Sequence, residues 1–219
     1  MFQNRNLSTT TKVKVCKAIT LSILLYGCET WTTYKHHLRG LEAFHIRSLQ
    51  SILDVTWSDK IPHTAILTRT QSTSIEAMLI TKQLRWVGHV IRMPEDRLPK
   101  RLLYGELEDG QRSVGGQKKR YKDSLKENLK ACNIIPDLLE NLATDRTLWR
   151  STVHEGITHF EERRTNARTM KRAARHARLQ RPPPGPGDGI PCPTCGKRCA
   201  SEFGLRSHQR SHRPRNGQE

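Results

Sequence analysis

The sequence predicts a mainly α protein, with an irregular helical body and a small ββα unit carried on a Pro-rich linker. Three observations carry this prediction. Apolar residues recur every three or four positions through much of the first part of the chain, which is the spacing of one helix face. A Pro- and Gly-rich run follows at 181–189, and a compact Cys/His pattern begins after it. We therefore expect a body at 10–180, the linker, a Cys/His unit at 190–213 and a disordered tail at 214–219.

The composition predicts a modest core and a polyanionic partner. Hydrophobic residues make up 35% of the chain and aromatic residues 5%, while 38 Lys and Arg against 21 Asp and Glu give a net charge of +17. Basic residues dominate the part that begins at Glu161. Such a charge excess favours nucleic acid as the partner. A solvated, poorly ordered charge run is the alternative interpretation of the basic tail.

The cysteines indicate a reducing compartment. Three of the six lie in the Cys/His unit, and Cys16, Cys28 and Cys132 are far apart. This pattern suits a metal site better than disulfides. No signal peptide or membrane-spanning run is visible, so we expect an intracellular protein, nuclear in preference to cytoplasmic.

Apolar spacing predicts three helical segments in the first third of the chain. The first begins at Thr9–Thr11, stops at Gly27, and has an apolar face of Val13, Cys16, Ile19, Ile23 and Tyr26. The second is capped by Thr32 or Thr33, and its apolar face consists of Leu38, Leu41, Leu49, Ile52 and Leu53. Pro62 opens the third, a short helical turn through Ile66 and Leu67.

The most regular helix of the body is predicted over about Ser74 to Arg92. Thr73 and Glu76 have the spacing of a capping box, and Pro94 ends the run. Its apolar stripe consists of Ile80, Leu84, Val87 and Ile91. Gly88 lies beside this stripe, where the missing side chain permits close approach of another helix. A stripe at this spacing predicts core packing and needs no further function.

A basic cluster follows the loop at Gly110–Gly116. Its members are Lys118, Lys119, Arg120, Tyr121 and Lys122, at the start of a helix whose apolar side is Leu125 and Leu129. Basic side chains beside an aromatic ring can hold a phosphate backbone and stack a base. A solvated helix start explains the same residues equally well. The loop lacks the GK[ST] ending of a nucleotide-binding P-loop.

The last part of the body is predicted as a long helix. Pro136 interrupts the preceding pattern, and Asp145 caps a segment through Trp149, Ile157 and Phe160. That segment then becomes strongly basic, with Arg163, Arg164, Arg168, Lys171, Arg172, Arg175 and Arg178. Its alanines favour helix. The linker at 181–189 is expected to be extended and semi-rigid because it is rich in proline.

The Cys/His unit has the spacing of a C2H2 zinc finger. Cys192 and Cys195 are separated by two residues, His208 and His212 by three, and twelve residues lie between the pairs. The short Cys spacing lets a tight turn present two thiolates, and the His spacing puts two imidazoles on one helix face. These four residues supply a closed tetrahedral site. We expect them to bind zinc, and Leu205 to pack beside the metal.

Cys199 stands where fingers of this kind usually carry Phe. A unit this small has almost no apolar core, so losing the aromatic weakens it unless Phe203 or Ile190 fills the gap. Cys199 is expected to be a small buried thiol, and a competing role as a metal ligand stays open.

The finger predicts nucleic-acid binding with little sequence preference. The helix positions that face base edges in DNA-reading fingers fall at Ser201, Gly204 and Ser207. None is an Arg, Lys, Asn or Gln that makes bidentate base contacts. Arg206 and Arg210 suit phosphates instead. We therefore expect these two residues, with Lys118, Lys119, Arg120 and Lys122, to contact the backbone of DNA or RNA.

The body also resembles the C-terminal region of reverse transcriptases from non-LTR (LINE-type) retrotransposons, across most of residues 10–180. The resemblance is carried by LLYGCETW at Leu24–Trp31, QLRWVGHVIRMPEDRLPKRLLYGEL at Gln83–Leu107 and GGQKKRYKDSLK at Gly115–Lys126. A single finger after a Pro-rich linker is similar to the end of some of these polyproteins. The resemblance implies the thumb and the region beyond the polymerase palm.

Polymerase chemistry needs adjacent aspartates to hold two divalent metals, and the sequence has no Asp-Asp pair. We expect no palm before Met1 and no endonuclease domain. The expected function is therefore that of a non-catalytic, zinc-binding remnant that binds nucleic acid. The competing classes are an active reverse-transcriptase fragment, a protein-interaction module whose finger docks a partner, and a translated relic without a selected role.

Overall fold

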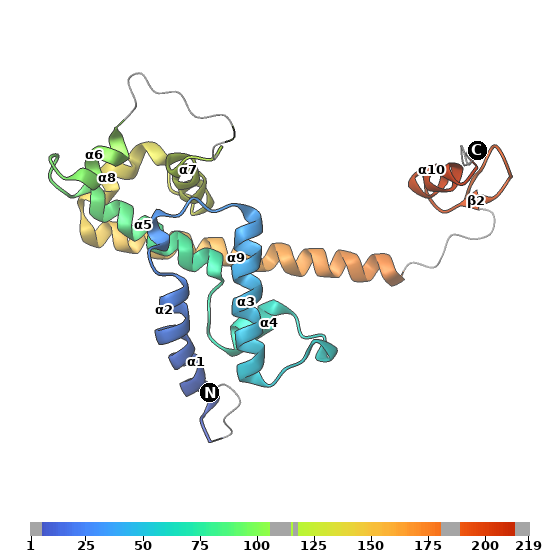
Figure 1. Ribbon diagram of the computed structural model, residues 1–219, viewed down its shortest axis with the longest axis horizontal. Helices are drawn as coiled ribbons and strands as arrows, with labels where there is room; N and C mark the ends of the chain where they lie inside the picture. Colours follow the sequence, from blue (N-terminus) through green and yellow to red (C-terminus); the bar gives the residue numbers. More distant parts are fainter. Residues whose placement is uncertain (1–5, 106–114, 116–117, 181–188, 213–219) are drawn as a thin grey trace. The chain divides into compact units, whose positions relative to one another are not determined.

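The computed structural model describes residues 6–105, 115, 118–180 and 189–212, which are mainly helical (Figure 1). The chain divides into two compact units, Met1–Ala167 and Arg168–Glu219. The loop expected at 110–116, apart from Gly115, and the linker expected at 181–189, apart from Gly189, lie outside the described residues, as does the expected tail at 214–219. No helix within the described ranges is long and apolar enough to cross a membrane.

The first predicted helix contains a π-turn. It runs as α1 (Thr9–Val15), η1 (Cys16–Thr20) and α2 (Leu21–Leu24). Ser8 caps it, because its Oγ accepts a hydrogen bond from the Thr11 N–H at 3.2 Å. In η1 the Leu21 N–H donates to the Cys16 carbonyl, so this turn holds one residue more than an α-helical turn.

The extra residue rotates the apolar face of the rest of the helix. Val13 and Cys16 are buried as predicted, but the buried positions then continue at Leu21 and Leu25. The prediction for the remaining three positions is wrong: the exposed fractions of Ile19, Ile23 and Tyr26 are 55%, 74% and 85%. The chain leaves the helix at Leu25 and turns at Gly27, which has a left-handed φ of +64° and precedes η2 (Cys28–Thr30).

The second and third helices are α3 (Lys35–Leu53) and α4 (His63–Arg69), with η3 (Trp57–Asp59) between them. Tyr34 precedes the first residue of α3, so the predicted cap at Thr32 or Thr33 is wrong by one or two residues. Pro62 precedes α4 as predicted. A cluster of buried residues joins α1, α3 and α4, and it includes Val13, Cys16, Ile46, Leu49, Ile52, Ile66 and Leu67.

Helix α5 (Ile75–Ile91) lies at the centre of the largest core cluster. The predicted capping box at Thr73 is wrong, because the cap is one residue later. The Ser74 Oγ accepts a hydrogen bond from the Ala77 N–H at 3.2 Å. The predicted apolar stripe is confirmed, since all four of its residues are buried: Ile80, Leu84, Val87 and Ile91.

The remaining helices of the first unit surround α5. They are α6 (Leu98–Tyr104), α7 (Tyr121–Ala131), η4 (Pro136–Leu138), α8 (Leu139–Thr144) and the start of α9 (Arg146–Gln180). Asp145 caps α9 as predicted: its Oδ1 accepts from the N–H groups of Thr147 at 2.7 Å and Leu148 at 3.2 Å. Leu125 and Leu129 of α7 are buried against α5, as their spacing predicted.

Trp149 attaches α9 to α5 at Gly88. A Cβ on Gly88 would lie 2.2 Å from the Trp149 Nε1, so the indole occupies the space that any side chain would need. The same Nε1 donates a hydrogen bond to the Leu84 carbonyl at 3.0 Å. Trp149 is 2% exposed. The predicted close approach at Gly88 is therefore confirmed.

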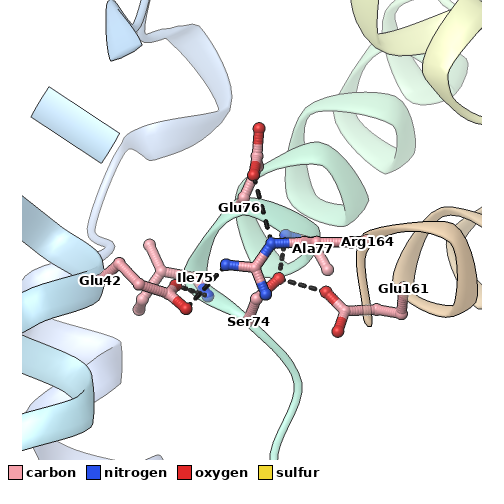
Figure 2. A network of polar contacts seen from close by, with 7 residues as sticks. All are labelled: Glu42, Ser74, Ile75, Glu76, Ala77, Glu161 and Arg164. Carbon is pink, nitrogen blue, oxygen red and sulfur yellow. Dashed lines mark hydrogen bonds and ion pairs between the residues drawn. The ribbon is translucent and has the colours of Figure 1, made fainter. Parts of the chain in front are cut away.

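A polar network makes a second attachment of α9 within the first unit (Figure 2). The Arg164 Nη2 lies 2.7 Å from the Glu42 Oε1 of α3. The other oxygen of Glu42 accepts from the Ile75 N–H at 3.0 Å, at the start of α5. The Ser74 Oγ donates to the Glu161 carboxylate. The side chains of Arg164 and Glu42 are 11% and 12% exposed, so water screens this ion pair little.

Within its described residues, the second unit contains the end of α9, two short strands and a further helix. Strands β1 (Ile190–Pro191) and β2 (Arg198–Cys199) pair antiparallel, with Ile190 opposite Cys199. Helix α10 (Glu202–Arg210) follows. Its cap is Ser201, whose Oγ accepts from the Gly204 N–H at 3.1 Å.

Replacing Gly88 by Ala should destabilise the first unit. The added methyl group would overlap the Trp149 indole, and overpacking of this kind costs about 1–3 kcal/mol of unfolding free energy. Gly40→Ala on α3 is the matched control, because a Cβ there meets nothing within 4 Å. The control should stabilise by up to about 1 kcal/mol. Urea unfolding of both variants measures the difference, and equal stabilities would contradict the contact.

Removing Arg164 should also destabilise the first unit. Arg164→Met leaves the nearly buried Glu42 without its ion-pair partner, which costs about 2–4 kcal/mol. The double variant Glu42→Gln, Arg164→Met should recover part of this loss, because Gln still accepts the Ile75 N–H. Arg47→Met, at an exposed position of α3, should change the unfolding free energy by less than about 0.5 kcal/mol. If the double variant loses as much unfolding free energy as Arg164→Met alone, the ion pair is not the cause of the loss.

Candidate metal centre

The two cysteines of the site are held by a tight turn. The Gly196 N–H donates to the Cys192 carbonyl at 2.9 Å, and the Cys192 N–H donates to the Lys197 carbonyl at 2.9 Å. Gly196 has a left-handed φ of +70°, which glycine adopts without strain. These contacts direct the thiols of Cys192 and Cys195 to one side of the turn.

The two histidines come from α10 and the residue pair that follows it. His208 lies in the last turn of the helix, and the His212 N–H donates to the Gln209 carbonyl at 3.2 Å, which continues the helical course. Their rings meet edge to face, with centroids 4.6 Å apart. Positions four residues apart share a helix face, so both Nε2 atoms point to the same place.

The four donor atoms lie close enough together to bind one tetrahedral metal ion. All lie within 4.8 Å of one another. The distances are 3.1 Å between the Cys195 Sγ and the His208 Nε2, 3.6 Å between the Cys192 Sγ and the His212 Nε2, and 3.1 Å between the two Nε2 atoms. Tetrahedral bonds of about 2.3 Å to sulfur and 2.0 Å to nitrogen place such donors roughly 3.3–3.8 Å apart, so the three distances lie within about 0.4 Å of those that a bound ion would set. The donor set therefore fits a metal ion.

The local electrostatics favour the thiolate that a metal needs. Burial acts to raise the pKa of Cys192, but hydrogen bonds from the backbone of Thr194 and Cys195 and the side chains of Cys195 and His212 lower that pKa to about 7. A thiol with this pKa gives up its proton readily at neutral pH, and the thiolate is the form that binds metal.

Cys199 lies outside this cluster. Its thiol is not among the four donors that the described residues bring together, and its side chain is buried on β2. Neither of the two side chains considered as substitutes for an aromatic residue at position 199 is buried: Phe203 is 83% exposed and Ile190 is 42% exposed. Leu205 is half-buried. Cys199 thus occupies the interior position with a smaller side chain than Phe.

The residues predicted to contact nucleic acid lie in two places. Lys118, Lys119, Arg120 and Lys122 are grouped before and at the start of α7, and Arg206 and Arg210 lie on α10. The Lys119 Nζ forms an ion pair of 2.6 Å with Glu127, so part of its charge is already neutralised. Arg206 pairs with Glu202 at 2.7 Å on an exposed face. Arg120 and Arg210 are exposed.

A basic pocket between α5 and the start of α9 was not predicted from the sequence. We call it the α5–α9 pocket; its volume is about 530 Å³, and it is lined by Glu29, Lys82, Arg85, Trp86, His89, Arg92, Arg146, Trp149 and Arg150. The available signal was the spacing of the basic residues of α5, which recur every three or four positions beside the apolar stripe. The packing of Trp149 on α5 brings Arg146 and Arg150 to that face.

No protein-family model matches this chain, and comparisons with curated proteins and with solved structures give no match either.

Cys195→Ser should lower metal affinity by about 100-fold or more, because it removes one of four ligands. Cys199→Ser is the matched control: it makes the same chemical change outside the cluster and should leave the affinity within a few-fold. Titration of the full chain with Co²⁺, followed by its thiolate-to-metal absorption bands, measures both. Equal losses in the two variants would show that the assigned ligand set is wrong.

Proposed function

We propose that this chain is a zinc-dependent, non-catalytic nucleic-acid-binding protein. The observation that carries the proposal is the donor set of Cys192, Cys195, His208 and His212, whose ligand atoms lie within 4.8 Å of one another. Two thiolates and two imidazoles suit zinc better than magnesium, calcium or manganese. Four protein ligands leave no position for a reacting water, which is the arrangement of a structural site. The zinc holds the strands and α10 together as a ββα finger.

The charge of the chain supports nucleic acid as the partner. The net charge of +17 favours a polyanion, and the exposed Arg120 and Arg210 extend guanidinium groups that suit phosphate. Lys118, Lys119, Lys122 and Arg206 supply further contacts to the backbone of DNA or RNA.

Recognition of sequence is weak in this proposal. Ser201, at one of the base-facing positions, uses its Oγ to cap α10. Gly204 has no side chain to reach a base, and Ser207 pairs with several bases. Affinity then comes chiefly from the release of counterions.

The resemblance to non-LTR reverse transcriptases supports an origin of the body in the region that follows the polymerase palm. The absence of an Asp-Asp pair from this sequence supports a role in binding instead of polymerisation. One observation favours a second candidate function, a protein-interaction module: Phe203 on α10 is 83% exposed, and exposed aromatic side chains are enriched at protein interfaces.

Binding of the full, zinc-loaded chain to single-stranded RNA, duplex DNA and an RNA hairpin should weaken as salt is raised. The slope of log affinity against log salt should be about −0.9 per duplex phosphate neutralised. Chelation of the zinc should lower the affinity, because α10 then loses its support. Fluorescence anisotropy at several salt concentrations measures both effects.

Two variants assign the contacts of α10. Arg210→Gln should weaken binding and make the salt slope shallower by about one unit, whereas Phe203→Ser should leave both unchanged. A selection from random duplexes should return no strong consensus. A defined motif would show that the finger reads sequence, and affinity unaffected by zinc removal would contradict the role of the finger in binding.

A further inference from the structure

The α5–α9 pocket concentrates positive charge within the first unit. Among the described residues that line it are five Lys and Arg side chains, Lys82, Arg85, Arg92, Arg146 and Arg150, and one acidic side chain, Glu29. Like charges held on facing helices disfavour the folded state. A bound anion would offset this repulsion, so the charge balance of the pocket itself favours an anionic ligand.

Three of these cations are available to a ligand. Arg85, Arg146 and Arg150 are exposed, and among the described residues none of them forms an ion pair or side-chain hydrogen bond. The other two serve the fold. The Arg92 Nη1 donates to the Ala143 carbonyl at 2.6 Å, and the Lys82 Nζ donates to the Leu25 carbonyl at 3.4 Å.

Aromatic side chains also line the α5–α9 pocket, beside its basic residues. The half-exposed Trp86 lies against His89, with ring centroids 5.6 Å apart. Trp149 forms the buried end of the pocket and is fixed by its hydrogen bond to the Leu84 carbonyl. Cations with an exposed aromatic ring beside them are the features by which proteins hold single-stranded nucleic acid: the cations contact phosphates and the ring stacks a base.

We propose that the α5–α9 pocket binds one unstacked nucleotide of a single-stranded nucleic acid. Its base stacks on Trp86, and Arg85, Arg146 and Arg150 contact the adjoining phosphates. A volume of about 530 Å³ is within the range of small-molecule sites. A base inside a duplex is paired and stacked, so it does not enter such a pocket. The inference shares the ligand class of the proposed function, but it needs neither the zinc nor α10.

The test uses the full chain with zinc and a fluorescent thymidine oligonucleotide of about ten nucleotides. Trp86→Leu should weaken binding by between about fivefold and 100-fold through loss of stacking, and Trp86→Phe should keep most of the affinity. The double variant Arg85→Gln, Arg150→Gln should make the salt slope shallower by about 1.4, which is about 0.7 for each single-strand phosphate. Circular dichroism of each variant establishes that it is folded.

The control removes the same charge elsewhere. Arg39→Gln, Arg47→Gln alters two exposed positions of α3 and should leave the salt slope unchanged. The inference is overturned if this control weakens binding as much as the pocket variant does, or if Trp86→Leu binds as the wild type. Inorganic polyphosphate is the second probe. If it displaces the oligonucleotide completely, and Trp86→Leu changes the affinity for neither the oligonucleotide nor polyphosphate, the pocket is an anion site only and the inference is overturned.

One further experiment distinguishes nucleic-acid binding by the pocket from binding by the proposed finger. When Trp86→Leu is added to the Cys195→Ser variant, it should still lower the affinity for the oligonucleotide, because the pocket lies in the first unit. If zinc removal abolishes binding while the pocket variants change nothing, the pocket inference fails and the proposed function stands. If the pocket variants weaken binding while zinc removal does not, the role of the finger fails instead.

Discussion

The packing of Trp149 on Gly88 is the contact that joins α9 to the central helix of the body, α5. An indole fits directly on the backbone of α5 because Gly88 has no side chain, and its N–H bonds the Leu84 carbonyl. The contact brings α9 against the apolar stripe of α5 and completes the largest core cluster. It also places Arg146 and Arg150 at the pocket that Lys82, Arg85 and Trp86 line from α5. A packing requirement thus creates a basic surface.

The second unit is stabilised in a different way. Cys192 and Cys199 are its buried apolar residues within the described part of the chain, so burial contributes little to its free energy of folding. Zinc binding to a site of this kind supplies roughly 10–16 kcal/mol. In the proposed zinc finger, Cys199 in place of the aromatic residue that such fingers usually carry would make folding depend still more on the metal. We therefore expect folding of this unit, and any binding through α10, to follow zinc availability.

Local signals made much of the fold predictable from the sequence. Proline, the Asp145 cap and the apolar stripe of α5 act within a few residues, and the spacing of the Cys and His residues identified the candidate metal centre. The π-turn at Cys16–Thr20 was not predictable, because no residue type encodes the extra residue in that turn. The face of α2 was consequently misassigned.

The ion pair of Glu42 with Arg164 and the α5–α9 pocket were not predictable either. Both depend on segments far apart in the sequence lying side by side, and such pairings leave no periodic pattern in one sequence. The contact between Gly88 and Trp149 was only partly predictable. Gly88 indicated a close approach of another helix, but Trp149, which packs on it, lies 61 positions later in the chain.

X-ray absorption at the zinc edge of the full chain tests the proposed ligand set of the candidate metal centre most directly. We predict one zinc bound by two sulfur atoms at about 2.3 Å and two nitrogen atoms at about 2.0 Å, with no oxygen ligand. Three sulfur ligands would mean that Cys199 joins the site. A zinc–oxygen bond would mean that one of Cys192, Cys195, His208 and His212 is not a ligand, and either result would contradict the assignment of a closed Cys2His2 structural site.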